Sequence, residues 1–329
     1  MEQPNLAYVR PKAKAGVGED ESAALFVDEC LLSQDSHSSS SAHPVSILGG
    51  KVRYVDGILS PDECARLCDR VDASTSLGFW SPVDGPEVRA FRDADTLEVH
   101  STQLALRLWG RCAAQLGPLL PPITVAQHEE DGGDVWEREL AGSTWIPRGL
   151  NHDLLFARYP SGGSFAPHTD GRTCHSFNRR SFDSVILFLN DIPEGMGGGT
   201  RFYCRDALSK LRREDGGSTA PHGRWSGDPS LVTGEVAAVS GRILVFDQQL
   251  AHEGVPPACG YQKYIIRSDV MYEREVPLCT SPVEVEAYAL YQRAEALAEE
   301  PGGALEAWGL MARALKMAPR MASIMGMAS

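Results

Sequence analysis

The residues best suited to chemistry lie in the string FAPHTDG, residues 165–171, which contains His168 and Asp170. On an extended strand, side chains two positions apart point to the same face, so His168 and Asp170 can meet one metal ion from a single segment. A lone His-x-Asp tripeptide also arises by chance, and a hydrogen-bonded histidine in a polar turn would explain it. The string therefore predicts a metal site only together with a third ligand from elsewhere in the chain.

His252 is the best candidate for that third ligand, because it follows a strand-like run, residues 241–247, with a polar end. Two histidines and one carboxylate can occupy one face of an octahedron and leave three positions open. This arrangement is typical of non-heme iron(II) oxygenases, which bind a co-substrate and dioxygen at the open positions. The sequence thus predicts a metal centre made by His168, Asp170 and His252.

The other histidines fit this role less well. His100 and His128 lie in or near segments with a helical pattern, and His152 has no partner at strand spacing. His175 follows the proposed ligands in a loop, where we expect a solvated side chain rather than a substrate contact. The remaining three lie in polar segments and are expected to be solvated: His37, His43 and His222.

Composition limits the classes of protein to consider. The chain has 329 residues, enough for one large catalytic domain with appendages, and a formal net charge of −13, which disfavours nucleic acid as a partner. No apolar run is long enough to span a membrane, and residues 1–7 lack the pattern of a secretory signal. The eight cysteines form no Cys-x-x-Cys pair, which indicates free thiols in a reducing compartment. We therefore expect a cytoplasmic protein, without excluding the nucleus.

The N-terminal part of the chain predicts a tail followed by supporting helices. Residues 1–45 include a Ser/His-rich stretch and are expected to be disordered. A short alternating strand over residues 52–55 begins the folded part. A capping box formed by Ser60 and Glu63 starts one helix, and apolar residues at every fourth position predict a second helix over residues 101–116. We interpret these helices as a scaffold.

The pattern changes near residue 153 to short strand-like runs separated by glycine, proline and asparagine. This density of strands is typical of a sandwich or barrel. Residues 205–233 are polar and predict a loop insertion. Residues 283–299 and 304–317 predict two helices, which we expect to pack as a hairpin on the catalytic domain or on a second subunit. The strand-like runs are residues 154–159, 184–189, 200–203, 242–246 and 263–267.

Several motifs, in order along residues 150–275, resemble the 2-oxoglutarate oxygenases of the prolyl 4-hydroxylase type. Tyr159, the glycine turn after it and the strand that carries His168 and Asp170 resemble the ligand strand of that family. Further motifs resemble its later strands: Leu189-Asn190-Asp191, Gly197-Gly198-Gly199-Thr200, His252-Glu253-Gly254 and residues 260–267.

The resemblance implies an α+β fold, with a double-stranded β-helix (jelly roll) as its core. N-terminal helices support this core and a C-terminal helical hairpin follows it. The chain then divides into a disordered tail over residues 1–45, a dioxygenase domain over residues 46–276 with its core at about 150–276, and an extension over residues 277–329.

The resemblance also implies cofactors. Iron(II) is held by His168, Asp170 and His252, 2-oxoglutarate is the co-substrate, and ascorbate keeps the iron reduced. The reaction is hydroxylation of a C–H bond, while 2-oxoglutarate is converted to succinate and carbon dioxide. Related halogenases have a small residue where this chain has Asp170, so hydroxylation is the expected outcome.

Four more residues are implied in binding 2-oxoglutarate. Lys263, eleven positions after His252, resembles the cation that binds the distal carboxylate. Strand alternation places Arg267 on the same face, so it is a rival anchor, a contact to an acidic substrate group or a surface ion pair. Tyr159 resembles the tyrosine that hydrogen-bonds the same carboxylate, and Thr200 is expected to line the pocket.

The substrate is not determined by these motifs. A peptidyl, prolyl-type substrate is the first expectation, and a small-molecule hydroxylase of the same superfamily is an alternative. A second alternative is a catalytically silent metal-binding module, with the C-terminal helices as the surface that binds a partner or a second copy of the chain. The complete set of ligands and a cationic anchor argue against loss of turnover, because decay should remove at least one of them.

Overall fold

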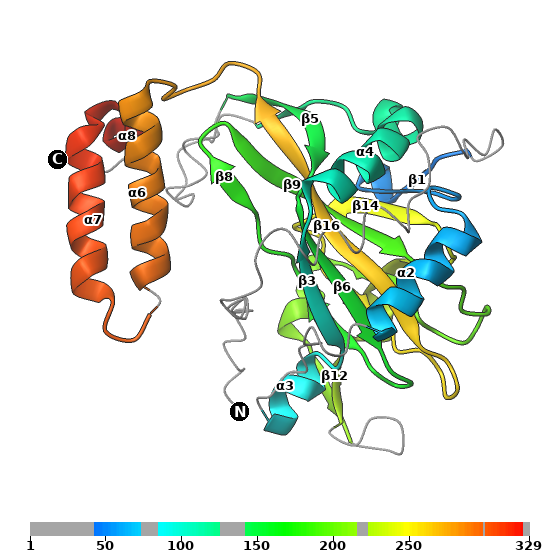
Figure 1. The fold of residues 1–329 in the computed structure, drawn as a ribbon. Coiled ribbons are helices and arrows are strands. Elements are labelled where there is room, and N and C mark those ends of the chain that lie inside the picture. The colour runs from blue at the N-terminus through cyan, green and yellow to red at the C-terminus, as the bar shows by residue number, and fades with distance from the viewer. Residues whose placement is uncertain (1–42, 74–84, 126–141, 216–222, 299, 325–329) are drawn as a thin grey trace.

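The computed structural model describes residues 43–73, 85–125, 142–215, 223–298 and 300–324. The tail expected over residues 1–45 lies almost entirely outside these ranges. Two antiparallel sheets form the core, as expected for a double-stranded β-helix (Figure 1). The fold is α+β, which confirms the fold class predicted from the sequence.

The larger sheet carries most of the strands. In order across the sheet they are β1 (Val45–Ile47), β2 (Val52–Val55), β14 (Ile243–Asp247), β9 (Arg179–Phe188), β16 (Lys263–Arg274), β5 (Thr144–Leu150) and β4 (Ile123–Thr124). Three more strands join this path: β6 (Asp153–Tyr159) pairs with the first half of β16, β3 (Asp95–His100) pairs with β6, and β8 (Cys174–Ser176) pairs with β9.

The smaller sheet carries the proposed metal ligands. Its order is β13 (Val232–Val236), β10 (Thr200–Tyr203), β15 (His252–Gly254) and β7 (Phe165–His168). Alternation along β9 shows how the two sheets pack. Val185 and Leu187 face the supporting helices, whereas Ile186 and Phe188 face the smaller sheet. Strand β9 therefore supplies both cores, as do β2, β6, β14 and β16.

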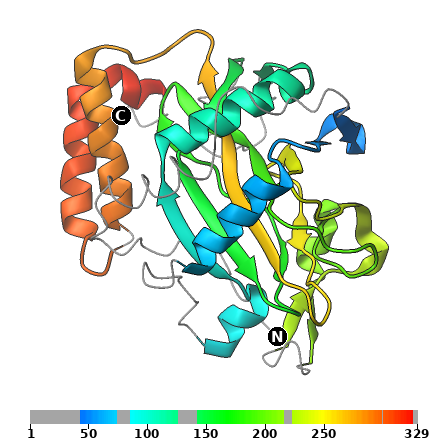
Figure 2. The ribbon, with the colours of Figure 1, turned by 45° about the vertical axis from the view of Figure 1, so that its right-hand side comes forward.

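Two helices cover the outer face of the larger sheet, α2 (Pro61–Ala73) and α4 (Thr102–Leu116) (Figure 2). The capping box that starts α2 is present, because the Glu63 backbone N–H donates to Ser60 Oγ and the Ser60 N–H donates to Glu63 Oε2. The buried faces of the two helices form one apolar cluster with the sheet. They contribute Cys64, Leu67, Val71, Leu104, Leu108 and Cys112, most of which are worth about 1.5–3 kcal/mol when fully buried.

The C-terminal helices form a hairpin beside this core, as predicted. They are α6 (Pro282–Ala298), α7 (Ala304–Met317) and a short α8 (Pro319–Ile324). The hairpin meets the β-sheet core at the segment that follows β7. There Gln292 Nε2 donates to the Cys174 carbonyl at 2.8 Å, and the rings of Phe177 and Tyr288 lie 4.5 Å apart.

Some elements differ from the sequence prediction. Strand β1 lies before the expected start of the fold, and β9 and β16 are much longer than the runs that predicted them. The stretch expected as a loop, residues 205–233, contains a small hairpin of β11 (Arg212–Glu214) and β12 (Arg224–Ser226). The short remaining elements are α3 (Gly85–Phe91) and the 3-10 turns η1 (Leu48–Gly50), η3 (Gly117–Leu119), η4 (Arg205–Ser209) and η5 (Pro229–Leu231).

Within the described ranges, the seven cysteines are free thiols, in keeping with their scattered spacing. None of the helices that could be assessed combines the length and the apolar character that a membrane crossing requires.

Candidate active site

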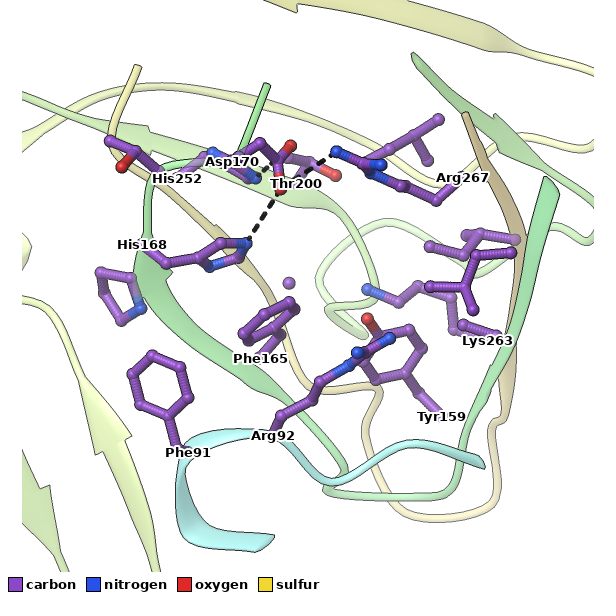
Figure 3. Close-up of a pocket in the computed structure, with 18 of the residues that line it drawn as sticks. Phe91, Arg92, Tyr159, Phe165, His168, Asp170, Thr200, His252, Lys263 and Arg267 are labelled. Atoms are coloured by element: carbon purple, nitrogen blue, oxygen red, sulfur yellow. Dashed lines mark ion pairs between the residues drawn. The ribbon is translucent and has the colours of Figure 1, made fainter. Parts of the chain in front are cut away.

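The three proposed ligands meet at one end of the smaller sheet. His168 is the last residue of β7 and His252 the first of β15, and these positions face each other directly in the antiparallel pair. Asp170 follows two residues later, where its backbone N–H donates to the Gln248 carbonyl at 3.1 Å. Asp170 Oδ1 lies 3.7 Å from His168 Nε2, and its Oδ2 lies 3.6 Å from His252 Nε2 (Figure 3). The ligand atoms of all three residues lie within 4.8 Å of one another.

Backbone carbonyls fix the orientation of both imidazole rings. His168 Nδ1 donates to the Ala166 carbonyl at 2.7 Å, and His252 Nδ1 donates to the Leu250 carbonyl at 2.9 Å. A carbonyl oxygen only accepts, so each ring carries its proton on Nδ1 and presents the Nε2 lone pair to the ligand site. Burial, together with the neighbouring His168, lowers the pKa of His252 to about 4, so this ring is neutral at physiological pH.

Two side chains orient the carboxylate of Asp170. Ser184, on β9, donates from Oγ to Oδ2 at 2.5 Å, and Arg267 Nη2 lies 3.6 Å from Oδ1. Burial alone would raise the pKa of Asp170, but the positive charge of Arg267 and the contacts with His252 hold it well below the ordinary value. The carboxylate is therefore ionised, as a metal ligand must be.

A buried polar network supports Arg267 from behind. Its guanidinium forms an ion pair with Asp269, with Nη2 at 3.0 Å from Oδ1. Asp269 is fully buried and accepts hydrogen bonds from Gln248 Nε2 at 2.9 Å and from Thr173 Oγ1 at 2.8 Å. Sequence reasoning missed this network and Ser184, although strand alternation places Arg267 and Asp269 on one face of β16. The guanidinium of Arg267 thus lies beside two carboxylates of this chain, those of Asp170 and Asp269.

Lys263 lies toward the other side of the site, across from Tyr159 in the pairing of β16 with β6. Its side chain is 2% exposed, and Nζ lies 4.2 Å from the centre of the Tyr159 ring. Among the residues that the structure describes, this ammonium has no hydrogen-bond or ion-pair partner. Burial lowers the pKa of Lys263 to about 7, because the charge is removed from water without a close carboxylate.

Space for a ligand is kept beside that ammonium. A Cβ added to Gly254, two residues after the ligand His252, would lie 3.3 Å from Lys263 Nζ and 3.4 Å from the Phe165 Cβ. Thr200, on the adjacent strand β10, also lines this part of the cavity. The sequence-predicted residues Lys263, Tyr159 and Thr200 therefore border one cavity together with the proposed metal ligands (Figure 3).

This cavity has a volume of about 1140 Å³ and continues from Lys263 past the ligands to Asp153 and Arg172. Aromatic rings form part of its wall. Phe165 stacks on the His168 ring with centres 3.6 Å apart, and the guanidinium of Arg92 lies 4.9 Å from the Phe165 ring centre. Neither Phe165 nor Arg92 was predicted to line the site. Their contact arises from a β-bridge that joins Arg92 to Phe165 of β7, two segments far apart in the sequence.

The residues present fit a metal ion and a small dianion. Two imidazoles and an ionised carboxylate are the donor set of the facial triad that binds iron(II). The buried, unpaired ammonium of Lys263 next to a side-chain-free Gly254 fits a carboxylate. Both features border one cavity, so one bifunctional molecule could reach the metal with one end and the ammonium with the other.

Comparison with known proteins finds solved structures with a similar fold. No protein-family model matches the sequence, and no curated protein is significantly similar to it. The viral collagen prolyl hydroxylase vCPH from Paramecium Bursaria Chlorella virus-1, in its 2OG complex, has 16% identity and a TM-score of 0.38, covering 68% of this chain and 96% of that chain. A Pseudomonas putida prolyl-4-hydroxylase has 15% identity and a TM-score of 0.39, with 69% and 94% covered.

A third neighbour is HygX from Streptomyces hygroscopicus with nickel, 2-oxoglutarate and hygromycin B bound. It has 14% identity and a TM-score of 0.38, with 68% of this chain and 82% of that chain covered. Two of these three structures are thus named as prolyl hydroxylases, and the third has nickel and 2-oxoglutarate bound. At these identities the similarity concerns the fold.

Proposed function

We propose that this chain is an iron(II)- and 2-oxoglutarate-dependent dioxygenase that hydroxylates a C–H bond of a peptidyl, prolyl-type substrate. One observation carries the proposal: the ligand atoms of His168, Asp170 and His252 share a cavity with the buried ammonium of Lys263. A metal-binding module without turnover would need the three ligands but would gain nothing from an unpaired buried cation, which destabilises the fold.

In this proposal, dioxygen is the oxidant and bound iron would activate it, while 2-oxoglutarate would supply two electrons and leave as succinate and carbon dioxide. One oxygen atom would enter the succinate and the other the new hydroxyl group of the substrate. The chain supplies orientation. Lys263 binds the distal carboxylate, Tyr159 lies beside it, and Thr200 closes the adjacent wall. His168 and His252 bind the metal through Nε2.

Asp170 completes the metal site in a fixed geometry. Ser184 and Arg267 contact different oxygens of its carboxylate, which limits rotation about the last side-chain bond. Phe165, Ile186 and Ile265 give the cavity an apolar lining near the site. We infer that these side chains exclude bulk water from the reacting atoms, which strengthens the electrostatic interactions there.

A second, smaller cavity supports the preference for a peptidyl substrate. It shares Asp170, Gly171 and Arg172 with the main cavity and has a volume of about 510 Å³. It continues to α6, where Tyr288 and Gln292 line it. A substrate of extended shape could therefore pass the metal and contact the C-terminal hairpin. A small-molecule substrate remains the alternative, and would use the main cavity alone.

The two connected cavities, here called the substrate track, suggest a separate role for each part of the chain in the domain division proposed from the sequence. Residues 46–276 would carry the chemistry, and the extension over residues 277–329 would form one wall of the substrate track. On the outer side of the hairpin, Leu305 and Trp308 are 84% and 71% exposed. These two side chains support contact with a partner protein or a second copy of the chain.

The test is succinate production from 2-oxoglutarate by the full chain, with iron(II), ascorbate and a panel of proline-containing peptides. We expect peptide-stimulated succinate formation, which the variant His168→Ala abolishes. His43→Ala, a change at an exposed histidine outside the site, is the matched control and should behave like the wild type. Stimulation by a small molecule and by no peptide would favour the alternative substrate class. Absence of turnover with metal still bound would favour the silent binding module.

A further inference from the structure

A second group of metal-ligating side chains lies at the opposite end of the main cavity from Lys263. It consists of His100, His152, Asp153 and His175, here called the mouth cluster. Asp153 lines the same cavity as the proposed iron ligands. Three of the nine histidines of the chain therefore gather around one carboxylate, in a place that the proposed reaction does not use.

The geometry of the mouth cluster is close to that of a metal site. His100 Nδ1 lies 2.7 Å from Asp153 Oδ1. The ring centres of His100 and His152 are 4.5 Å apart, and those of His152 and His175 are 4.9 Å apart. One ligand atom from each of His100, His152 and Asp153 lies within 4.8 Å of the others. Zinc bonds of about 2.0–2.2 Å in a tetrahedron place donor atoms about 3.4 Å apart, so small side-chain rotations are sufficient.

The backbone holds two of these elements in place. His100 and Asp153 are direct partners in the pairing of β3 with β6. At the end of this pair, the Ser101 N–H donates to the His152 carbonyl at 2.8 Å, and the Asp153 N–H donates to Asn151 Oδ1 at 3.2 Å. His100 and Asp153 thus lie at paired strand ends, and His152 lies in the two-residue connection between β5 and β6, where its carbonyl is held by Ser101.

The third element, β8, carries His175 and is fixed on both sides. The carbonyl of Cys174 accepts from Gln292 Nε2 of α6 at 2.8 Å, and the backbone N–H of Thr173 donates to Ser181 Oγ at 2.8 Å. Burial lowers the pKa of both His152 and His175, and the charge of Arg179 acts in the same direction on each. Both rings are therefore neutral near pH 7 and can offer a lone pair to a metal.

We propose that His100, His152 and Asp153 bind a divalent transition metal of the zinc type, with His175 as the fourth ligand. The metal takes the place of the hydrogen bond between His100 Nδ1 and Asp153 Oδ1, with the imidazole proton of His100 on Nε2. Because the ligands come from β3, the start of β6 and β8, the metal cross-links three strands at the cavity mouth. It also fixes the segment that leads away from Asp170, and thereby the entrance to the proposed active site.

The test is the stoichiometry of zinc binding by the full chain, measured in competition with a chromophoric chelator. We expect two zinc equivalents for the wild type. His152→Ala should bind one, and the pair of changes His168→Ala and Asp170→Ala should also bind one, at the other site. All three changes together should abolish binding. The pair His37→Ala and His43→Ala, two histidines of the N-terminal Ser/His-rich stretch, is the control and should retain two.

A second readout identifies the coordination. Cobalt(II) in a four-coordinate site of nitrogen and oxygen donors absorbs visible light much more strongly than six-coordinate cobalt(II). We expect an intense band that is lost in His152→Ala and kept in His168→Ala. If His152→Ala fails to fold, Asp153→Asn, which preserves side-chain size, takes its place and should lose the same band.

One result overturns the proposal. The wild type would bind a single zinc equivalent, His152→Ala would still bind it, and the pair of changes His168→Ala and Asp170→Ala would abolish it. Failure of the oxygenase proposal gives a different result. In that case the equivalent at the mouth cluster persists while 2-oxoglutarate consumption is absent.

Discussion

The two ends of the main cavity differ in how strongly water screens the charges of their side chains. At the inner end, Lys263, Tyr159 and His252 are each less than 5% exposed. At the mouth, the side chains of His100 and Asp153 are 43% and 33% exposed. Buried charges interact strongly because little water screens them, whereas exposed pairs contribute at most about 1 kcal/mol. The inner end can therefore hold one small anion tightly, and the mouth depends on a metal or a substrate for any strong interaction.

The largest effect should come from removing the carboxylate that completes the inner metal site. Asp170→Ala leaves two imidazoles and removes the only negative ligand, so we expect 2-oxoglutarate consumption to fall below detection. Loss of one partner of a buried charge group costs about 3–5 kcal/mol, which corresponds to roughly 10²- to 10⁴-fold in metal affinity. Anaerobic iron titration measures the affinity. Wild-type consumption by Asp170→Ala would show that the carboxylate is not a ligand.

The next effect tests the buried ammonium. Lys263→Ala removes the cation that we expect to bind the distal carboxylate of 2-oxoglutarate, and this should weaken co-substrate binding by about 2–4 kcal/mol, roughly 30- to 1000-fold. Metal affinity should change much less. Lys210→Ala, at an exposed lysine, is the matched control. An unchanged dissociation constant in Lys263→Ala would direct attention to Arg267 as the anchor.

The pH dependence of co-substrate binding follows from the same residue. Burial lowers the pKa of Lys263 to about 7, and a bound carboxylate favours the charged form. Affinity for 2-oxoglutarate should therefore be highest below pH 7 and fall by roughly tenfold per pH unit above it, about 30-fold by pH 8.5. Titrations with manganese(II) in place of iron at pH 6.5, 7.5 and 8.5 measure this slope. In Lys263→Arg the slope should flatten, because a guanidinium stays charged throughout this range.

The smallest effect concerns the orientation of Asp170. Ser184→Ala removes one hydrogen bond to the carboxylate and leaves Arg267 in place. Partners of this kind typically affect metal affinity by about 10- to 100-fold, and we expect about tenfold here. Ser209→Ala, at an exposed serine of η4, provides the comparison. An iron affinity that Ser184→Ala leaves unchanged would mean that Arg267 alone fixes the carboxylate.

Part of the inner end follows local rules, whereas the anchor role of Lys263 came from the resemblance to a known family. His168 and Asp170 belong to one short segment, and Lys263 and Arg267 lie on one face of one strand. The helices α2, α4, α6 and α7 were predicted for the same reason, since capping boxes and apolar periodicity are also local. Ser281 and Glu284 form a capping box at the start of α6.

The mouth cluster could not be predicted, because it depends on pairings between distant segments. His152 had no partner at strand spacing, and its neighbour His100 comes from β3, which lies in a segment interpreted as helical. The residues that support Asp170 could not be predicted for the same reason. Ser184 and Asp269 become neighbours of the metal ligands only after β9 and β16 are paired, and nothing in either segment alone indicates that pairing.

The most direct test of the central claim is the visible charge-transfer band that iron(II) and 2-oxoglutarate form together under anaerobic conditions. The account predicts a band in the wild type that Lys263→Ala weakens and that Asp170→Ala weakens or abolishes. A wild type that retains iron but shows no band on addition of 2-oxoglutarate would contradict it, and the chain would then be a metal-binding module that does not use this co-substrate.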